Sequence, residues 1–128
     1  MASLSQASSV QVHDLGDRSV IRFPGPRVVL DEQNTHTMGE QLLALVKRLQ
    51  AGWFVVDMRN VTYLTSTALG LLLRVRQELH TRGSRLTLCH LSPHLHEVFQ
   101  VTNLHNVFDI RQRAEELTGE ATEPRQTP

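Results

Sequence analysis

The amino-acid sequence predicts one α/β domain with the element order β-β-α-β-α-β-α-β-α. Short apolar runs alternate along the chain with longer segments in which apolar residues recur at helical spacing, and a Gly-Asp turn separates the first two runs. Strands that alternate with helices pair in parallel through right-handed crossovers, whereas strands joined by a tight turn pair antiparallel. We therefore expect a mixed, mostly parallel sheet with an opening hairpin and with helices packed on it.

The first two strands are expected on either side of Gly16-Asp17, and Pro24-Gly25-Pro26 ends the second. Their apolar residues are Val10, Val12 and Leu15, followed by Val20, Ile21 and Phe23. A helix is expected next, because apolar residues recur at i, i+4, i+7, i+8 and i+11, as Met38, Leu42, Leu45, Val46 and Leu49. Thr37 and Glu40 have the form of a capping box, so this helix is expected to begin there and to end at Ala51-Gly52.

The remaining elements follow from similar signals. A compact apolar run between Gly52 and Asp57 is typical of a strand covered on both faces, and Ser92-Pro93 is a strong helix start. The expected ranges are a strand at 54–56, a helix at 66–80 that stops before Gly83, a strand at 86–89, a helix from Pro93, a strand at 107–110 and a helix at 111–117. Residues 1–9 and 119–128 are polar and are expected to be flexible tails, which leaves 10–118 as the domain.

The charge balance and the apolar runs exclude several classes of protein. Lys+Arg and Asp+Glu number 13 each, so the net charge is zero, which argues against binding to nucleic acid or to an anionic membrane surface. The longest apolar runs, 68–73 and 53–56, are too short to cross a bilayer, and the first residues lack a signal-peptide pattern. The one cysteine, Cys89, excludes an internal disulfide and is typical of a reducing compartment. We expect a soluble, cytoplasmic protein.

No motif in the sequence predicts catalysis or a cofactor. The phosphate-binding patterns GxGxxG and GxxxxGK[ST] and the hydrolase pattern GxSxG do not occur. Asp57 ends a predicted strand as a single acid, which is typical of a cap or turn residue. Cys89, His90, His94 and His96 are of types that bind zinc, but adjacent strand residues point to opposite faces and helix residues two apart diverge. We therefore expect no catalytic residue and no metal site.

The start of the second helix is the candidate regulatory site. Thr65, Ser66 and Thr67 place consecutive hydroxyls where unpaired N–H groups and the positive end of the helix dipole favour an anion. Either Thr65 or Ser66 would cap the helix, and one cap is enough. The small residues Ala68 and Gly70 leave the start of the helix uncluttered. A phosphoryl group on Ser66 would be accepted there and would add about two negative charges to the surface.

The sequence over 55–108 resembles the STAS domain, the family of sulfate-transporter and anti-sigma-factor antagonist domains. The family pattern is an apolar strand ending in Asp, then Asp-Ser-Ser-Gly-Leu-Gly at a helix start, a Gly before the next strand, and a Thr/Gly-Leu turn before a Phe strand. The matching segments are 54–57, 65–70, Gly83, 102–104 and 107–108. The resemblance covers about residues 10–117, and Thr65 and Ala68 stand where the family has Asp and Gly.

The resemblance implies a regulator that is not an enzyme. Ser66 aligns with the serine that family members have phosphorylated, with Thr65 and Thr67 as fallback acceptors. The unphosphorylated protein would bind an ATP-binding anti-sigma kinase and so release a sigma factor for transcription, and a serine phosphatase would restore binding. The implied partner-binding residues are Thr65, Ser66, Thr67, Ala68, Leu69, Gly70 and Leu73. The alternative is an adaptor subunit of a stress-signalling or lipid-transport assembly with no phosphorylation cycle, which the missing acid before Ser66 favours.

Overall fold

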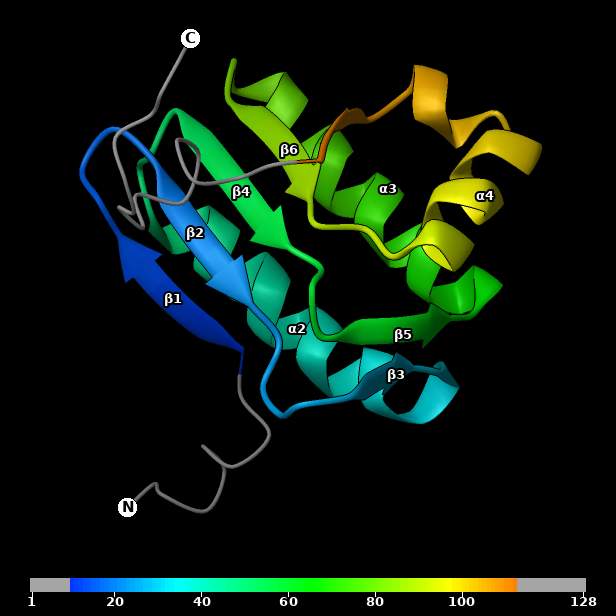
Figure 1. Cartoon of the computed structure of the whole chain (residues 1–128). Helices are drawn as coiled ribbons and strands as arrows, with labels where there is room; N and C mark the ends of the chain where they lie inside the picture. The colour runs from blue at the N-terminus through cyan, green and yellow to red at the C-terminus, as the bar shows by residue number, and fades with distance from the viewer. Residues whose placement is uncertain (1–9, 113–128) are drawn as a thin grey trace, which may run out of the picture.

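The structure is a computed structural model that describes residues 10–112 (Figure 1). In chain order its elements are β1 (Gln11–Asp14), β2 (Ser19–Arg22), β3 (Val28–Leu30), α2 (Glu32–Arg48), β4 (Trp53–Asp57), β5 (Val61–Leu64), α3 (Ser66–Thr81), β6 (Arg85–Cys89), α4 (Pro93–Val101), a 3₁₀ turn at Leu104–Asn106, and β7 (Asp109–Arg111). The predicted alternation is present, with two short strands added. The expected tails and most of the expected helix at 111–117 lie outside the described residues, and Arg111 itself ends β7.

Five strands form the main sheet in the order β1-β2-β4-β6-β7. β1 pairs antiparallel with β2, whereas β2, β4, β6 and β7 pair in parallel, with Val20 beside Val55 and Val55 beside Thr87. This confirms the α/β class, the mostly parallel sheet and the opening hairpin. The hairpin turns where the Gly-Asp signal predicted it, because Gly16 adopts a φ of +95°, which glycine reaches at little cost.

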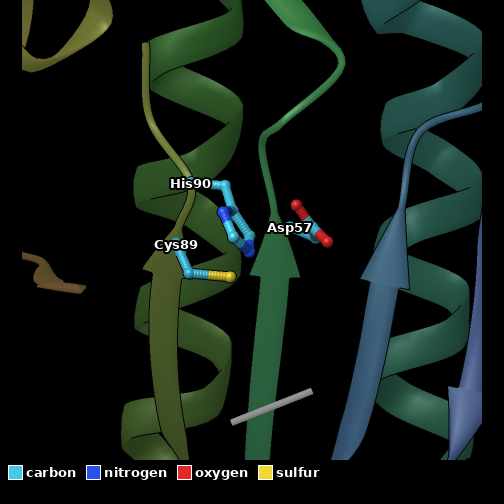
Figure 2. A group of neighbouring side chains, drawn as sticks. All are labelled: Asp57, Cys89 and His90. Carbon is cyan, nitrogen blue, oxygen red and sulfur yellow. The ribbon is translucent and has the colours of Figure 1, made fainter. Parts of the chain in front are cut away.

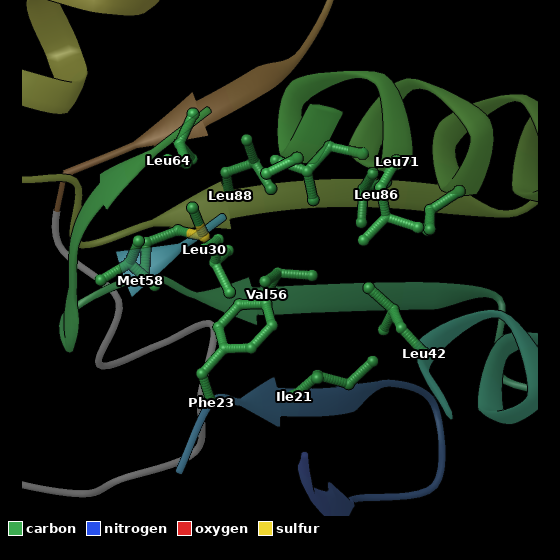
Figure 3. Packing of buried hydrophobic residues seen from close by; sticks show 14 of the residues in the cluster. Ile21, Phe23, Leu30, Leu42, Val56, Met58, Leu64, Leu71, Leu86 and Leu88 are labelled. Carbon is green, nitrogen blue, oxygen red and sulfur yellow. The ribbon is translucent and has the colours of Figure 1, made fainter. Parts of the chain in front are cut away.

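The helices α2 and α3 pack on one face of the main sheet and close the larger apolar core (Figures 1 and 3). Ile21, Val56 and Leu88 come from three neighbouring strands and share this core with Leu42 of α2 and Leu72 of α3. All five side chains are fully buried. Burying each of them stabilises the fold by about 1.5–3 kcal/mol. Among the described residues, no helix has both the length and the apolar character that a membrane span requires.

Helix α2 begins earlier than the sequence predicted. Its N-cap is Asp31, whose carboxylate accepts hydrogen bonds from the backbone N–H groups of Gln33 and Asn34, both at 3.0 Å. The Asn34 side chain accepts in return from the Asp31 N–H at 2.9 Å, which completes a capping box. The expected start at Thr37 is therefore wrong, and Thr37 lies inside the helix. The true capping box has Asp31 where the common pattern has Ser or Thr, and Asn34 where it has Glu or Gln.

Two short strands, β3 and β5, pair in parallel as a separate sheet that the sequence analysis did not predict. Val28 and Leu30 on β3 and Val61 and Leu64 on β5 are buried, so both strands pack against the core. The backbone N–H of Thr65, just beyond β5, donates to the Leu30 carbonyl at 2.9 Å. This small sheet therefore fixes the start of α3 beside the start of α2.

The last elements agree with the sequence except for one boundary. Ser92 caps α4 by accepting from the Leu95 N–H at 3.2 Å, and Pro93 is the first helical residue, as predicted. The final strand begins at Asp109 rather than at residue 107. The backbone N–H groups of Val107 and Phe108 both donate to the Leu104 carbonyl and so belong to the 3₁₀ turn.

A chain of polar contacts connects β4, β6 and β7. The single tryptophan, Trp53, donates from its indole N–H to the Thr87 hydroxyl at 2.9 Å, and that hydroxyl donates to the Asp109 carboxylate at 2.7 Å. Arg85 and Arg111 also pair with this carboxylate. Burial disfavours the ionised form of Asp109, but the hydrogen bonds from Thr87 and Arg111 outweigh it, so the pKa of Asp109 lies below its ordinary value.

An Asp109→Asn variant should lose about 1 kcal/mol of unfolding free energy at pH 7. A carboxyl whose pKa is lower in the folded than in the unfolded chain stabilises the fold above the unfolded pKa, about 3.9, and this contribution disappears as the pH falls through the folded pKa. The difference between wild type and variant should therefore shrink below about pH 4. Urea unfolding followed by Trp53 fluorescence measures it. Asp17→Asn is the control, because Asp17 is 73% exposed and should contribute little. An undiminished difference at low pH would contradict the assignment.

Candidate functional site

Thr65, Ser66 and Thr67 lie at the start of α3, but their hydroxyls have different surroundings. Thr65 is the N-cap, and its Oγ1 accepts from the Ala68 N–H at 3.4 Å and donates to the Leu30 carbonyl at 3.3 Å. The Thr65 hydroxyl therefore already donates one hydrogen bond and accepts another. Thr65 is the residue that caps the helix, which settles the choice that the sequence left open between Thr65 and Ser66.

Ser66 and Thr67 are exposed in the first turn of α3. Within the described part of the chain, neither hydroxyl takes part in a hydrogen bond. The first turn of α3 also has no acidic residue, whereas that of α2 has Glu32. The positive end of the α3 dipole is therefore not offset by a carboxylate of its own turn, and this position favours an added anion.

The seven residues predicted to bind a partner do not share one surface. Ser66, Thr67 and Leu73 are exposed, and Thr65, Leu69 and Gly70 are half-buried. Ala68 is fully buried in the core, so it packs α3 against the sheet and does not contact a partner. The helical repeat places Ser66, Leu69 and Leu73 on one stripe and Thr67, Gly70 and Arg74 on the next.

The second stripe of α3 borders a groove against α2, with a cavity of 580 Å³. Thr67, Gly70 and Arg74 line one side, and Thr35, His36 and Glu40 are among the residues on the other. Thr35 is buried, and its Oγ1 has no hydrogen-bond partner among the residues that the structure describes.

The sequence analysis placed no residue of α2 at this site. Gly39 was the available signal, because a glycine inside a helix often marks close packing. A Cβ at Gly39 would lie 3.0 Å from Leu71 Cδ1, so the two helices approach closely there. A Cβ at Gly70 would meet nothing within 4 Å. The glycine at 70 therefore leaves open space at the groove, and packing does not require it.

Asp57, at the end of β4, is paired rather than alone. Its side chain is 0% exposed and accepts from Arg22 Nε at 2.9 Å and from Arg59 Nε at 3.0 Å. It also accepts from the Arg59 backbone N–H at 3.0 Å, which is the turn contact that the sequence suggested. Burial disfavours its ionised form, but the hydrogen bonds from Arg59 and Arg22 outweigh burial and hold the pKa of Asp57 below its ordinary value.

The sequence analysis expected Cys89 and His90 to point to opposite faces of the sheet. In the structure they do not. β6 ends at Cys89, and His90 adopts a φ of +59°, which turns its imidazole back toward the Cys89 side. Figure 2 shows both side chains directed toward the end of β4, where Asp57 lies. One potential ligand atom from each of Asp57, Cys89 and His90 lies within 4.8 Å of the others.

Comparison with known proteins agrees with this fold. An anti-sigma-B factor antagonist of Listeria monocytogenes is 33% identical over 64 residues, which span 50% of this chain and little more than half, 56%, of that protein. The solved structure of an anti-sigma-factor antagonist (STAS) domain protein from Planctomyces limnophilus has 24% identity and a TM-score of 0.76, and the match covers 87% of this chain and 95% of that one. The phosphorylated form of the Bacillus cell fate determinant SpoIIAA has 19% identity and a TM-score of 0.62, covering 84% and 96%.

These two solved structures show a shared fold. The family is shown by the sequence itself, because the model of the STAS domain matches residues 9–117, which include every described element. The resemblance seen in the strand before Asp57 and in the start of α3 is thereby confirmed, and the chain belongs to the STAS domain family.

Proposed function

We propose that this protein is an anti-sigma-factor antagonist that binds an ATP-binding anti-sigma kinase and is released when Ser66 is phosphorylated. The observation that carries the proposal is the exposed Ser66 hydroxyl, which makes no hydrogen bond to the described residues and lies in a helix first turn with no acidic residue. The Listeria relative is named as an anti-sigma-B factor antagonist, and SpoIIAA has been solved in a phosphorylated form. Both names support the same activity here.

The switch follows from where the charge is added. A phosphoryl group on Ser66 adds about two negative charges at pH 7. The backbone N–H groups at the start of α3 can donate hydrogen bonds to it without disturbing the fold. A docked partner would have to desolvate the same charge, which costs far more than desolvating a hydroxyl. The unmodified surface binds, therefore, and the phosphorylated surface does not. Removal of the phosphoryl group by a serine phosphatase restores binding.

The docking surface consists of the two exposed stripes of α3 and the groove against α2. Leu73, 37% exposed, provides apolar area on the same stripe as Ser66. The groove provides the open space at Gly70. A partner side chain can enter this open space, which gives binding specificity as well as area.

Phosphorylation by the cognate kinase tests the proposal. The purified chain is incubated with the kinase and ATP, and the modified residue is located by mass spectrometry. One phosphoryl group is expected on Ser66, and Ser66→Ala should remain unmodified while Thr67→Ala is modified as the wild type is. Modification confined to residues outside 65–67, or none at all, would contradict the proposal.

The adaptor function remains the second candidate, and Thr65 is the observation that favours it. The family has an acid at this position, whereas the Thr65 hydroxyl here is bonded to the Leu30 carbonyl and the Ala68 N–H. An adaptor would bind its partner constitutively through the same surface. Binding that is insensitive to a negative charge at Ser66 distinguishes the adaptor from the switch.

A Gly70→Ala variant should be more stable than wild type and bind its partner less well. Alanine inside a helix is favoured over glycine by about 0.8–1.0 kcal/mol, and the new methyl group meets no atom within 4 Å. The same methyl group narrows the groove. Urea unfolding measures the first effect and calorimetric titration with the kinase the second.

Gln100→Ala is the control, because Gln100 is exposed on α4, away from the stripes of α3, and does not line the groove. It should leave the affinity for the kinase unchanged. Wild-type affinity in Gly70→Ala would place the groove outside the docking surface.

A further inference from the structure

The side chains of Asp57, Cys89 and His90 form a cluster at the ends of two neighbouring strands (Figure 2). We propose that this cluster binds one divalent transition-metal ion such as Zn²⁺, through the Cys89 thiolate, an imidazole nitrogen of His90 and a carboxylate oxygen of Asp57, with water as a further ligand. This activity goes beyond partner switching and does not depend on it.

The distances suit a small ion. Because the three ligand atoms lie within 4.8 Å of one another, a point exists within about 2.8 Å of all three. Zinc binds sulfur at about 2.3 Å and nitrogen or oxygen at about 2.0–2.2 Å. Each side chain would therefore have to move by less than about 1 Å to reach bonding distance, which small torsional changes can supply.

The backbone brings the ligands together in two ways. Asp57 and Cys89 are register partners in the parallel pairing of β4 with β6, so their side chains leave the same face at the same edge. The Met58 N–H donates to the Cys89 carbonyl at 2.9 Å and ties the two strand ends to each other. His90 then adopts its positive φ of 59°, a conformation that few residues other than glycine take without cost. A strained residue that redirects an imidazole toward a thiol and a carboxylate points to a function for that imidazole.

The ligand types select the class of metal. Thiolate and imidazole favour zinc and its neighbours in the first transition row, whereas Mg²⁺ and Ca²⁺ prefer sites made of oxygen ligands alone. When the ion binds, the Cys89 sulfur forms the metal bond and its proton leaves to solvent. His90, which is half-buried, is the member of the cluster through which an ion can enter, because Asp57 and Cys89 are buried.

Arg22 and Arg59 hold the Asp57 carboxylate in place by hydrogen bonds. Three donor atoms, Arg22 Nε, Arg59 Nε and the Arg59 backbone N, bond to Asp57. These donors make four hydrogen bonds to the carboxylate, because Arg59 Nε contacts both oxygens, so they occupy its lone-pair positions. An ion would have to displace one of the Arg59 Nε contacts, which the 41% exposed Arg59 side chain can release by turning toward solvent. The arginines orient the carboxylate, as groups hydrogen-bonded to metal ligands commonly do. Their positive charges also oppose the ion, so we expect weaker binding than at a zinc site with four protein ligands.

The test is a titration of the untagged full chain with Co²⁺, followed by displacement with Zn²⁺. Cobalt bound to a thiolate gives a sulfur-to-metal charge-transfer band in the near ultraviolet, and equilibrium dialysis gives the number of Zn²⁺ ions bound. We expect one ion per chain and a charge-transfer band that Zn²⁺ abolishes. Cys89→Ala should remove the band, and His90→Gly should weaken binding at least tenfold.

The variants are chosen to remain folded. Alanine is small enough for the buried position of Cys89, and glycine suits the positive φ of His90, so His90→Gly should not reduce thermal stability. His96→Ala is the matched control, since His96 lies nearby in sequence but outside the cluster, and it should bind cobalt as wild type does. Absence of a charge-transfer band in the wild type would overturn the proposal. Equal Zn²⁺ binding by wild type and His90→Gly would overturn it as well, even if Cys89→Ala failed to fold.

Discussion

A Val55→Asp variant should yield no folded protein. Val55 lies in the middle of β4 with β2 on one side and β6 on the other, and it is 0% exposed. It packs with Val20 and Cys89 in a second apolar cluster, separate from the core under α2 and α3. An aspartate there would place a carboxylate among apolar side chains, or a protonated acid with unsatisfied oxygens.

The expected cost is large enough to unfold the chain. Burying an unpaired charge costs several kcal/mol even after relaxation, and the loss of valine packing adds to it, while a domain of this size is stabilised by about 5–15 kcal/mol in total. The measurement is the soluble yield and the far-ultraviolet circular dichroism spectrum. Val12→Asp is the control, because Val12 is 37% exposed on the edge strand β1 and its replacement should leave the fold intact. A Val55→Asp protein with the wild-type spectrum would show that β4 is not the central buried strand.

The second large effect is on binding. A Ser66→Asp variant should fold normally and lose affinity for the kinase by about 30-fold or more, which corresponds to about 2 kcal/mol. The carboxylate lies at the start of α3, where a negative charge stabilises the helix by about 0.3–1 kcal/mol, so thermal stability should stay equal or rise slightly. The affinity falls because the charge must lose its water when the partner docks.

Titration calorimetry with the ATP-bound kinase measures this affinity. Ser66→Ala should bind at least as tightly as wild type and resist release by ATP. Gln100→Glu is the charge-matched control, since it adds the same charge to an exposed position on α4, outside the stripes of α3. Unchanged binding by Ser66→Asp would favour the constitutive adaptor.

Much of the fold could be predicted because its signals are local. The turn at Gly16-Asp17, the helix start at Ser92-Pro93 and the apolar run of β4 each depend on a few neighbouring residues, and each element forms where expected. The strands β3 and β5 could not be recognised in this way. They have three and four residues, and each is stabilised by pairing with a segment more than 30 positions away.

The candidate site likewise has one part that local sequence signals predict and another that depends on long-range packing. The hydroxyl run at the start of α3 was identifiable because helix starts have known chemistry, and the structure exposes Ser66 as that interpretation required. The groove against α2 depends on how two helices pack, and the Arg22–Asp57 pair joins residues 35 apart. The positive φ of His90 contradicts the usual alternation along a strand, so the Asp57–Cys89–His90 cluster required coordinates.

The bond between Thr65 and Leu30 has a consequence for recognition. Leu30 directly precedes Asp31, the cap of α2, and its carbonyl accepts from both the backbone N–H and the hydroxyl of Thr65, the cap of α3. One peptide group thus joins the beginnings of two helices that are far apart in sequence. A partner that contacts both helices meets a preorganised surface, and it loses little affinity to the entropy of aligning them. In the switch proposed above, this preorganised surface would bind the partner tightly while Ser66 is unmodified, and one phosphoryl group would be enough to prevent binding.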